Sequence, residues 1–120
     1  MENKRILIIG GTGTLGKELI RNLYRKNKIS VLSRDEHKQA LLKKEYPFIK
    51  FYLGDIRNLN NHDYAFHNID VVFHVAALKH VDILENDPLE SIKTNVLGSI
   101  NIAEACIRNN VKYCMFSSTD

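Results

Sequence analysis

The sequence predicts an α/β fold: a doubly wound parallel sheet with strand order 3-2-1-4-5 and helices on both faces. Three observations predict it. Short apolar runs alternate with helical segments along the chain, the first run ends in glycines that open a helix, and no low-complexity segment interrupts the series. Parallel strands need right-handed crossovers, and these place helices on both faces of one sheet. At 120 residues, the chain has the length of a single domain.

The expected strands are short apolar runs, and the first of them is the clearest. "RILIIG" (5–10) is continuously apolar and ends in glycines, which is typical of a strand buried on both faces. Four further strands are predicted at 28–33, 49–55, 70–77 and 111–118. Ligands bind such sheets beyond the carboxyl ends of the strands, at the point where the winding reverses. We therefore expect a site beside the first and fourth strands.

Helices are expected between these strands. The first covers about 14–27, with apolar residues on one stripe at Leu15, Leu19, Ile20 and Leu23. Ser33 and Glu36 fit a Ser-x-x-Glu capping box for the second helix, which runs to about Tyr46. The segment "NNHDYAFHN" has room only for a short helix.

The last helix is the best defined. Asp87 is expected to cap it, Pro88 suits its first position, and Glu90 follows three residues after the cap. Apolar residues then recur at steps of three and four, at Leu89, Ile92, Val96, Ile100, Ala103 and Ile107. Cys106 and Cys114 fall in this helix and in the strand after it. Because small secreted domains usually carry a disulfide framework, we expect two buried free thiols in a reducing compartment.

Charge and hydropathy narrow the classes of function. Lys and Arg number 17 against 14 Asp and Glu, and the basic residues are scattered. Solvated helix faces explain this pattern better than a nucleic-acid surface does, so no nucleic-acid partner is expected. The apolar stretch near the start is too short for a signal peptide or a membrane span, which favours a cytoplasmic protein without membrane contact. The histidines lack paired ligand spacing, so no metal site is predicted, and His74 is expected to be a core residue.

The segment "GGTGTLG" is the main candidate for a ligand site. Its glycines lie between an expected strand and an expected helix, which is the context of dinucleotide binding. Gly10 permits a tight turn, Gly13 lets the backbone approach a pyrophosphate, and Gly16 lets the helix pack closely on the sheet. The helix N-terminus then faces the anion with free N–H groups. The alternative is a purely structural turn, and a P-loop is excluded because no Gly-Lys-Ser/Thr follows.

The residues after the second strand bear on the type of cofactor. An Asp or Glu there would bind the ribose 2′-hydroxyl of NAD, but "LSRDE" puts Ser33 and Arg34 in that place, with Lys38 a turn later. A hydroxyl and two cations suit a 2′-phosphate and favour NADP. Asp35 leaves NAD as an alternative, and a helix cap with solvated cations would explain the same residues. Asp55, in "GDIR" after the third strand, fits either an acceptor for the adenine amino group or an ordinary turn.

These features together resemble the extended short-chain dehydrogenase/reductase superfamily. Within it, the chain is similar to the UDP-N-acetylglucosamine 4,6-dehydratase (inverting) group of nucleotide-sugar dehydratases. The resemblance covers the whole chain through "GGTGTLGK", "SRDEHKQ", "GDIR", "AALKHV", "ENDPLESIKTNVLGSINIAEA" and "SSTD". Asp82 and Asp87 depart from the group, which usually has proline and asparagine there. The resemblance implies a Rossmann-type NADP-binding domain over residues 1–120, truncated after the fifth strand and without a substrate domain.

The resemblance also implies roles for individual residues. Besides Gly10 and Gly16 in the turn, Thr12, Gly13, Thr14 and Leu15 would line the cofactor phosphates, and Ser33, Arg34, Asp35 and Lys38 would hold the ribose phosphate. Asp55 and Ile56 would hold the adenine, Ala76, Ala77 and Lys79 would border the nicotinamide, and Asn95 would order the active-site backbone and water. Thr119 and Asp120 would be catalytic: Thr119 polarises the C4 oxygen of the sugar, and Asp120 is the acid for the departing C6 hydroxyl.

The implied reaction is an internal redox cycle on a UDP-sugar. Hydride passes from C4 to NADP, the C6 hydroxyl is eliminated, and hydride returns at C6. The base and the Tyr-x-x-x-Lys pair expected after Asp120 are absent, and Tyr24…Lys28 and Tyr46…Lys50 are badly placed for that role. We therefore expect the N-terminal part of a homo-oligomeric dehydratase, inactive by itself. The alternatives are a UDP-sugar 4-epimerase and a non-catalytic NADP-binding module.

Overall fold

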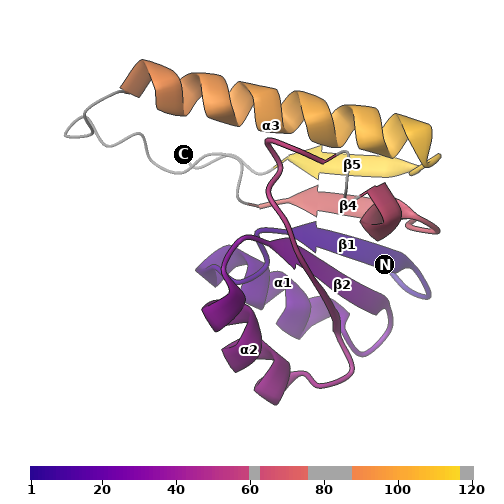
Figure 1. The fold of residues 1–120 in the computed structure, drawn as a ribbon. Coiled ribbons are helices and arrows are strands. Elements are labelled where there is room, and N and C mark those ends of the chain that lie inside the picture. Colours follow the sequence, from indigo (N-terminus) through magenta and orange to yellow (C-terminus); the bar gives the residue numbers. More distant parts are fainter. Residues whose placement is uncertain (60–62, 76–87, 117–120) are drawn as a thin grey trace.

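The computed structural model describes residues 1–59, 63–75 and 88–116, the last range with side chains from residue 96 onward. Its core is a five-stranded parallel sheet in the order β3-β2-β1-β4-β5 (Figure 1). The strands are β1 (Arg5–Ile9), β2 (Lys28–Ser33), β3 (Lys50–Leu53), β4 (Val71–His74) and β5 (Tyr113–Phe116). The predicted fold class and strand order are confirmed. β2 has the predicted bounds, whereas β1 ends one residue before the predicted end and β3 is shorter than the predicted 49–55.

The connecting helices cover both faces of the sheet (Figure 1). They are α1 (Thr14–Leu23), α2 (Glu36–Glu45), the short 3-10 helix η1 (Asp63–Phe66) and α3 (Pro88–Arg108). Residues of α1 and α2 share one hydrophobic cluster with the sheet, and residues of η1 and α3 share another. The winding reverses between β1 and β4, so the carboxyl ends of these two strands border the expected site.

β1 shows why its sequence is apolar at every position. Ile6 and Ile8 belong to the cluster under α1 and α2, whereas Leu7 and Ile9 belong to the cluster under α3 and η1. All four side chains are at most 2% exposed. Because successive strand residues point to opposite faces, a central strand covered on both sides needs an apolar residue at each step. Burial of each such side chain contributes about 1.5–3 kcal/mol.

The first helix is shorter than predicted. α1 ends at Leu23, and the Asn27 side chain donates to the Leu23 carbonyl oxygen at 3.0 Å. Lys28 N then donates to Lys4 O at 2.9 Å, which starts the β1–β2 pairing. The predicted apolar stripe of α1 is wrong at Leu15, which is 48% exposed.

The cap of the second helix differs from the expectation. Asp35, and not Ser33, is the N-cap of α2, because its carboxylate accepts from Lys38 N at 2.9 Å. Ser33 cannot take this position because it is the last residue of β2 and pairs with Leu53 of β3. The predicted Ser33–Glu36 capping box is therefore wrong, although a helix does start at Glu36.

Replacement of Asp35 by alanine should lower the free energy of unfolding by about 1 kcal/mol, because the Lys38 N–H group loses its acceptor. Chemical denaturation of the variant beside the wild type measures this loss. Asp35→Asn is the matched control, since an asparagine side chain also caps helices well. A stability loss in Asp35→Asn as large as that in Asp35→Ala would contradict the capping role.

The apolar series that predicted α3 is not the face that packs on the sheet. Ile102, Ala105 and Cys106 are at most 5% exposed and lie in the cluster over the sheet. In contrast, Val96, Ile100 and Ile107 of the predicted series are 54%, 49% and 77% exposed. Both thiols are free, but only Cys106 is buried, whereas Cys114 is half-buried. α3 therefore carries two apolar faces, one on the sheet and one on the surface.

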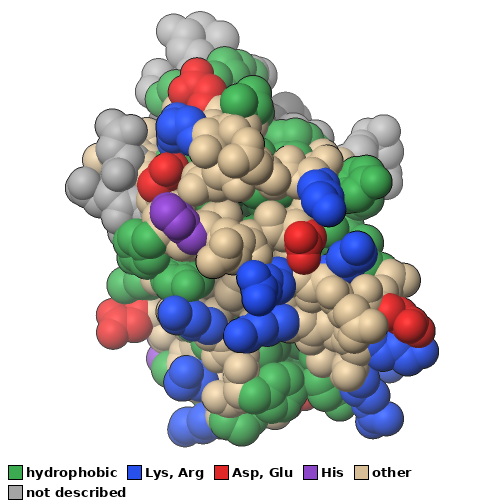
Figure 2. Space-filling model, turned by 90° about the vertical axis from the view of Figure 1, so that its right-hand side faces the viewer, with side chains coloured by type: hydrophobic (Ala, Val, Ile, Leu, Met, Phe, Trp, Pro, Cys, Tyr) green, Lys and Arg blue, Asp and Glu red, His purple; other side chains and the backbone are tan. Residues whose placement is uncertain are grey.

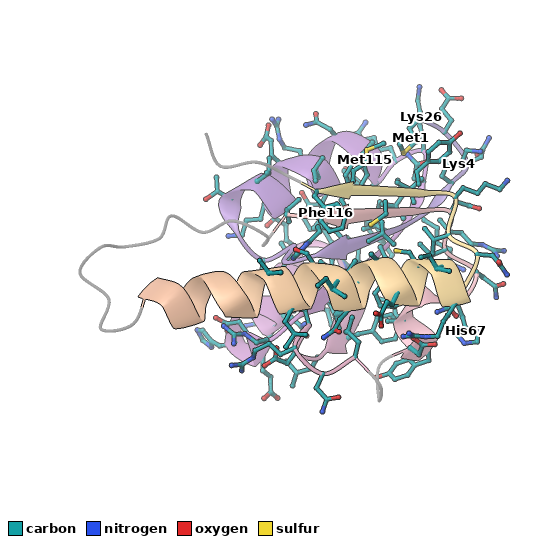
Figure 3. The ribbon with its side chains drawn as sticks, turned by 90° about the horizontal axis from the view of Figure 1, so that it is seen from above. Met1, Lys4, Lys26, His67, Met115 and Phe116 are labelled. Carbon is teal, nitrogen blue, oxygen red and sulfur yellow. The ribbon has the colours of Figure 1, made fainter. Side chains whose placement is uncertain are left out.

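Two surfaces lie away from the expected site. Figure 2 shows Lys and Arg side chains scattered among Asp and Glu on one side of the molecule. β5 is an edge strand with Tyr113, Met115 and Phe116 exposed, and Figure 3 shows the latter two on this strand. Within the described ranges, no helix has both the length and the apolar character needed to cross a membrane.

Candidate functional site

The turn between β1 and α1 is shaped by two of its glycines. Gly10 has a φ of 82°, a left-handed conformation that favours glycine, and its N–H donates to Leu32 O at 2.9 Å. A Cβ atom on Gly16 would lie 2.4 Å from Gly11 Cα and 2.6 Å from its carbonyl carbon. α1 therefore rests directly on the backbone of the turn, and the expected structural roles of Gly10 and Gly16 are confirmed.

Gly13 differs, because nothing in the described structure demands a glycine there. Its φ is −83°, and the nearest atom recorded for an added Cβ is Gly10 O, at an ordinary contact distance of 3.8 Å. Gly13 is the exposed N-cap of α1, and no side chain caps this helix in the described residues. Its first turn also holds no acidic residue. The free N–H groups and the positive end of the helix dipole are thus open to an external anion, with room for close approach.

A buried glutamine holds the ends of β2 and β3 against α2. Gln39 is 8% exposed, and its Nε2 donates to Ser33 Oγ at 2.7 Å and to Tyr52 O at 2.7 Å. Gly54 N donates to Ser33 O at 2.9 Å across the same strand ends. Ser33 is itself buried, so its hydroxyl faces Gln39. The pattern "KQALL" offered no signal for this role beyond a polar residue within a helix.

Beyond β3, Asp55 is held between two arginines. Arg57 donates to Asp55 Oδ1 from its backbone N at 2.9 Å, and to Oδ2 from its Nε at 2.9 Å. Arg34 Nη1 lies 3.8 Å from Asp55 Oδ2. The hydrogen bonds from Arg57 lower the pKa of the Asp55 carboxyl below its ordinary value, with a smaller contribution from Arg34. The acceptor expected for an adenine amino group is therefore a charged carboxylate that already binds Arg57.

α3 fixes the loop that carries these residues. Asn101 Nδ2 donates to Ile56 O at 2.9 Å and to Arg57 O at 3.2 Å. A Cβ on Gly98 would lie 2.4 Å from Ile56 Cδ1, so the glycine lets Ile56 pack against the helix. Neither Asn101 nor Arg57 could be identified from the sequence. Asn101 binds residues 44 and 45 positions away, and Arg57 is defined by its contacts with the Asp55 side chain.

The sequence-predicted site residues fall into three groups. The first group lies at the carboxyl ends of three adjacent strands. The glycine turn with Thr12, Thr14 and Leu15 follows β1, Ser33 and Arg34 lie at the end of β2, and Asp55 and Ile56 follow β3. Asp35 and Lys38 begin α2, where the Asp35 carboxylate is used by the cap. Ala76, Ala77, Lys79, Thr119 and Asp120 lie outside the described residues, as does the Asn95 side chain. Among the side chains described, no group of three or more His, Cys, Asp or Glu could hold a metal ion.

Two curated relatives are similar along nearly the whole chain. A UDP-N-acetylglucosamine 4,6-dehydratase (inverting) from Campylobacter jejuni is 43% identical over 122 residues, which cover 98% of this chain and 36% of that protein. A UDP-glucose 4-epimerase from Rickettsia canadensis is 40% identical over 126 residues, which cover 98% of this chain and 37% of that protein. The chain thus spans little more than a third of the length of these relatives.

Solved structures share the fold. Pen from Bacillus thuringiensis superposes with a TM-score of 0.87 at 45% identity, over 98% of this chain and 39% of that one. UDP-glucose 4-epimerase from Bifidobacterium longum, in complex with NAD+ and UDP, gives a TM-score of 0.75 at 25% identity, over 95% of this chain and 36% of that one.

A family model supplies the assignment. The model described as "Polysaccharide biosynthesis protein" matches residues 6–120, from β1 to the last residue given. The same stretch includes the glycine turn, the arginine pair around Asp55 and the helix that holds their loop. Together with the relatives above, this match confirms the resemblance to nucleotide-sugar dehydratases of the short-chain dehydrogenase/reductase superfamily. The chain belongs to the polysaccharide biosynthesis protein family.

Proposed function

We propose that this chain is the NADP-binding, N-terminal part of a cytoplasmic, homo-oligomeric nucleotide-sugar 4,6-dehydratase that acts on UDP-N-acetylglucosamine. The observation that carries the nucleotide-binding part is Gly13, an exposed N-cap that no side chain caps and where the described fold has no need of glycine. Nucleotide-sugar enzymes among the relatives and a solved neighbour with NAD+ bound support this proposal.

The described residues fit a dinucleotide. The pyrophosphate would lie at the N-terminus of α1, against the backbone N–H groups of the turn. The adenosine would extend toward the β2 and β3 ends, where Arg34, Asp55 and Ile56 lie. When bound, the nicotinamide would accept a hydride from the sugar and return it. This chain's residues would bind and orient the cofactor on one edge of the sheet.

The use of Asp35 as a cap favours NADP over NAD. An NAD-binding site needs a carboxylate near the β2 end to accept from the ribose 2′-hydroxyl. The Asp35 carboxylate instead accepts from Lys38 N, and Asp55 binds Arg57. Arg34, whose side chain is 65% exposed, carries a positive charge at the end of β2. These contacts suit a phosphate better than a hydroxyl.

The choice of dehydratase follows the relative with 43% identity, with Thr119 and Asp120 proposed as the first catalytic residues. A 4-epimerase is the second candidate, supported by the relative with 40% identity. Both reactions begin with oxidation of the sugar at C4, so the cofactor half of the site serves either. They differ in the product, because dehydration removes one water from the sugar and epimerisation changes no mass.

Two measurements test the proposal. Isothermal titration should show that NADP binds to the purified protein, and more tightly than NAD does. Mass spectrometry after incubation of the full-length protein with UDP-N-acetylglucosamine should show a product that has lost one water. An epimer of unchanged mass would favour the second candidate instead. If the protein bound neither NADP nor NAD, the proposed role in cofactor binding would be contradicted.

A further inference from the structure

Two guanidinium groups and one carboxylate lie together where the carboxyl ends of β2 and β3 meet. Arg57 Nη2 and Arg34 Nη1 lie 2.5 Å and 3.8 Å from the same oxygen, Asp55 Oδ2. The side chains of Arg57 and Arg34 are 50% and 65% exposed, whereas that of Asp55 is 30% exposed. Both cations therefore reach solvent, and each contacts the less exposed carboxylate.

The charges in this cluster do not cancel. Arg57 contacts Asp55 through three nitrogen atoms, and its hydrogen bonds hold the pKa of the Asp55 carboxyl below the ordinary value, so the carboxylate is ionised. Arg34 has only the longer contact at 3.8 Å. Because Arg57 already neutralises Asp55, the cluster keeps one net positive charge. Without Arg57, the carboxylate would instead neutralise Arg34.

The backbone that carries Arg57 is fixed before any ligand arrives. Asn101 binds the carbonyl oxygens of Ile56 and Arg57, and Arg57 N donates to Asp55 Oδ1. Ile56 is packed against Gly98 of α3. A cation on an anchored loop loses less conformational entropy on binding than one on a free loop does.

We propose that Arg57 is a specificity-determining residue that forms, with Arg34, a two-guanidinium site for the 2′-phosphate of the cofactor's adenosine ribose. The proposal rests on the dinucleotide cofactor of the proposed function and adds a residue from the loop after β3. A phosphomonoester carries between one and two negative charges at neutral pH. Arg57 gives the cluster one net positive charge to meet it, whereas Arg34 and Asp55 alone would be neutral. Arginine suits this ligand because its planar fork matches phosphate oxygens.

The test compares dissociation constants for NADP and NAD in Arg57→Gln and the wild type, measured by isothermal titration. Arg57→Gln should raise the dissociation constant for NADP about tenfold or more, because a charge-assisted hydrogen bond is lost. The same variant should change NAD affinity by less than about threefold, since NAD lacks the phosphate. Arg57→Lys should keep part of the preference for NADP over NAD, because lysine retains the positive charge but not the planar guanidinium group.

Arg21→Gln is the matched control. It also removes an exposed arginine paired with a carboxylate, Glu18, but in the last turn of α1. Thermal unfolding of each variant confirms that it is folded. A second pair of ligands isolates the contribution of the 2′-phosphate. Arg57→Gln should weaken the binding of adenosine 2′,5′-bisphosphate but leave the binding of 5′-AMP nearly unchanged.

The outcomes separate this inference from the proposed function. Equal losses of NADP and NAD affinity in Arg57→Gln would mean that Arg57 only shapes the loop, and would overturn the assignment. Unchanged NADP affinity would overturn it as well. If the wild type bound neither dinucleotide, the proposed cofactor function would fail at once, whatever the behaviour of Arg57→Gln.

Discussion

Gly16→Ala should lower the free energy of unfolding by about 2–3 kcal/mol, because the new methyl group has no space. The added Cβ would lie 2.4–2.7 Å from three backbone atoms of Gly11, and backbone cannot rotate away as the end of a side chain can. α1 must therefore lift from the turn and lose part of the contact of Ile20 with the sheet. The gain in helix propensity from glycine to alanine, about 1 kcal/mol, offsets only part of this cost.

Gly13→Ala is the matched control, since it makes the same change three residues earlier. Its Cβ would meet only Gly10 O at 3.8 Å, so the loss of stability should stay at about 1 kcal/mol or less, from the poorer N-cap. NADP affinity should nevertheless fall by about tenfold or more, because the methyl group would occupy the space proposed for the pyrophosphate. Urea denaturation and isothermal titration measure the two effects. Equal stability losses in the two variants would contradict the close packing at Gly16.

The free energy of unfolding should fall by about 3 kcal/mol as the pH falls from 6.5 to 4, because His74 is buried in its neutral form. His74 is 0% exposed, and its ring contacts that of Phe116, with centroids 5.5 Å apart. Burial lowers the pKa of His74 from 6.5 to about 4. Between these values the unfolded chain binds a proton that the folded chain does not. The loss therefore begins below pH 6.5 and is complete near pH 4.

Urea denaturation at a series of pH values measures this slope. Asp55 and Asp63 titrate lower, because arginines depress the pKa of each carboxyl below 3.8, so their contributions are lost at more acidic pH. His74→Gln should remove most of the slope between pH 4 and 6.5. His67→Gln, at an exposed position after η1 (Figure 3), is the control for loss of one imidazole. If the free energy of unfolding of His74→Gln fell with pH as it does in the wild type, the effect would not come from His74.

The fold and the glycine turn could be predicted because their signals are local. The apolar run of β1 and the glycines after it are contiguous, and their spacing alone indicates a buried strand, a tight turn and a close helix. The cap of α2 was predicted wrongly, because Ser33 was chosen although Asp35 is an equally good cap residue. Pairing of Ser33 with Leu53 in the sheet decides between them, and that pairing is not visible in the local sequence.

The rest depends on contacts between distant residues. Periodicity showed that α3 is apolar but not which of its faces meets the sheet, because the helix has two. Gly98 settles the orientation, since only a residue without a side chain leaves room for Ile56. The motif "GDIR" indicated no role for Arg57, whose contacts with Asp55 and with Asn101 are seen only in the folded chain.

The bond between Asn101 and the loop after β3 has a consequence for the order of folding. It joins residues separated by 44 or 45 positions, and such contacts form late because a long loop must first close. The glycine turn needs only β1, α1 and β2, which are neighbours in the chain. During folding, the glycine turn can therefore form early, while the loop after β3 is completed only when α3 docks. Tight dinucleotide binding would then report that the last helix is in place.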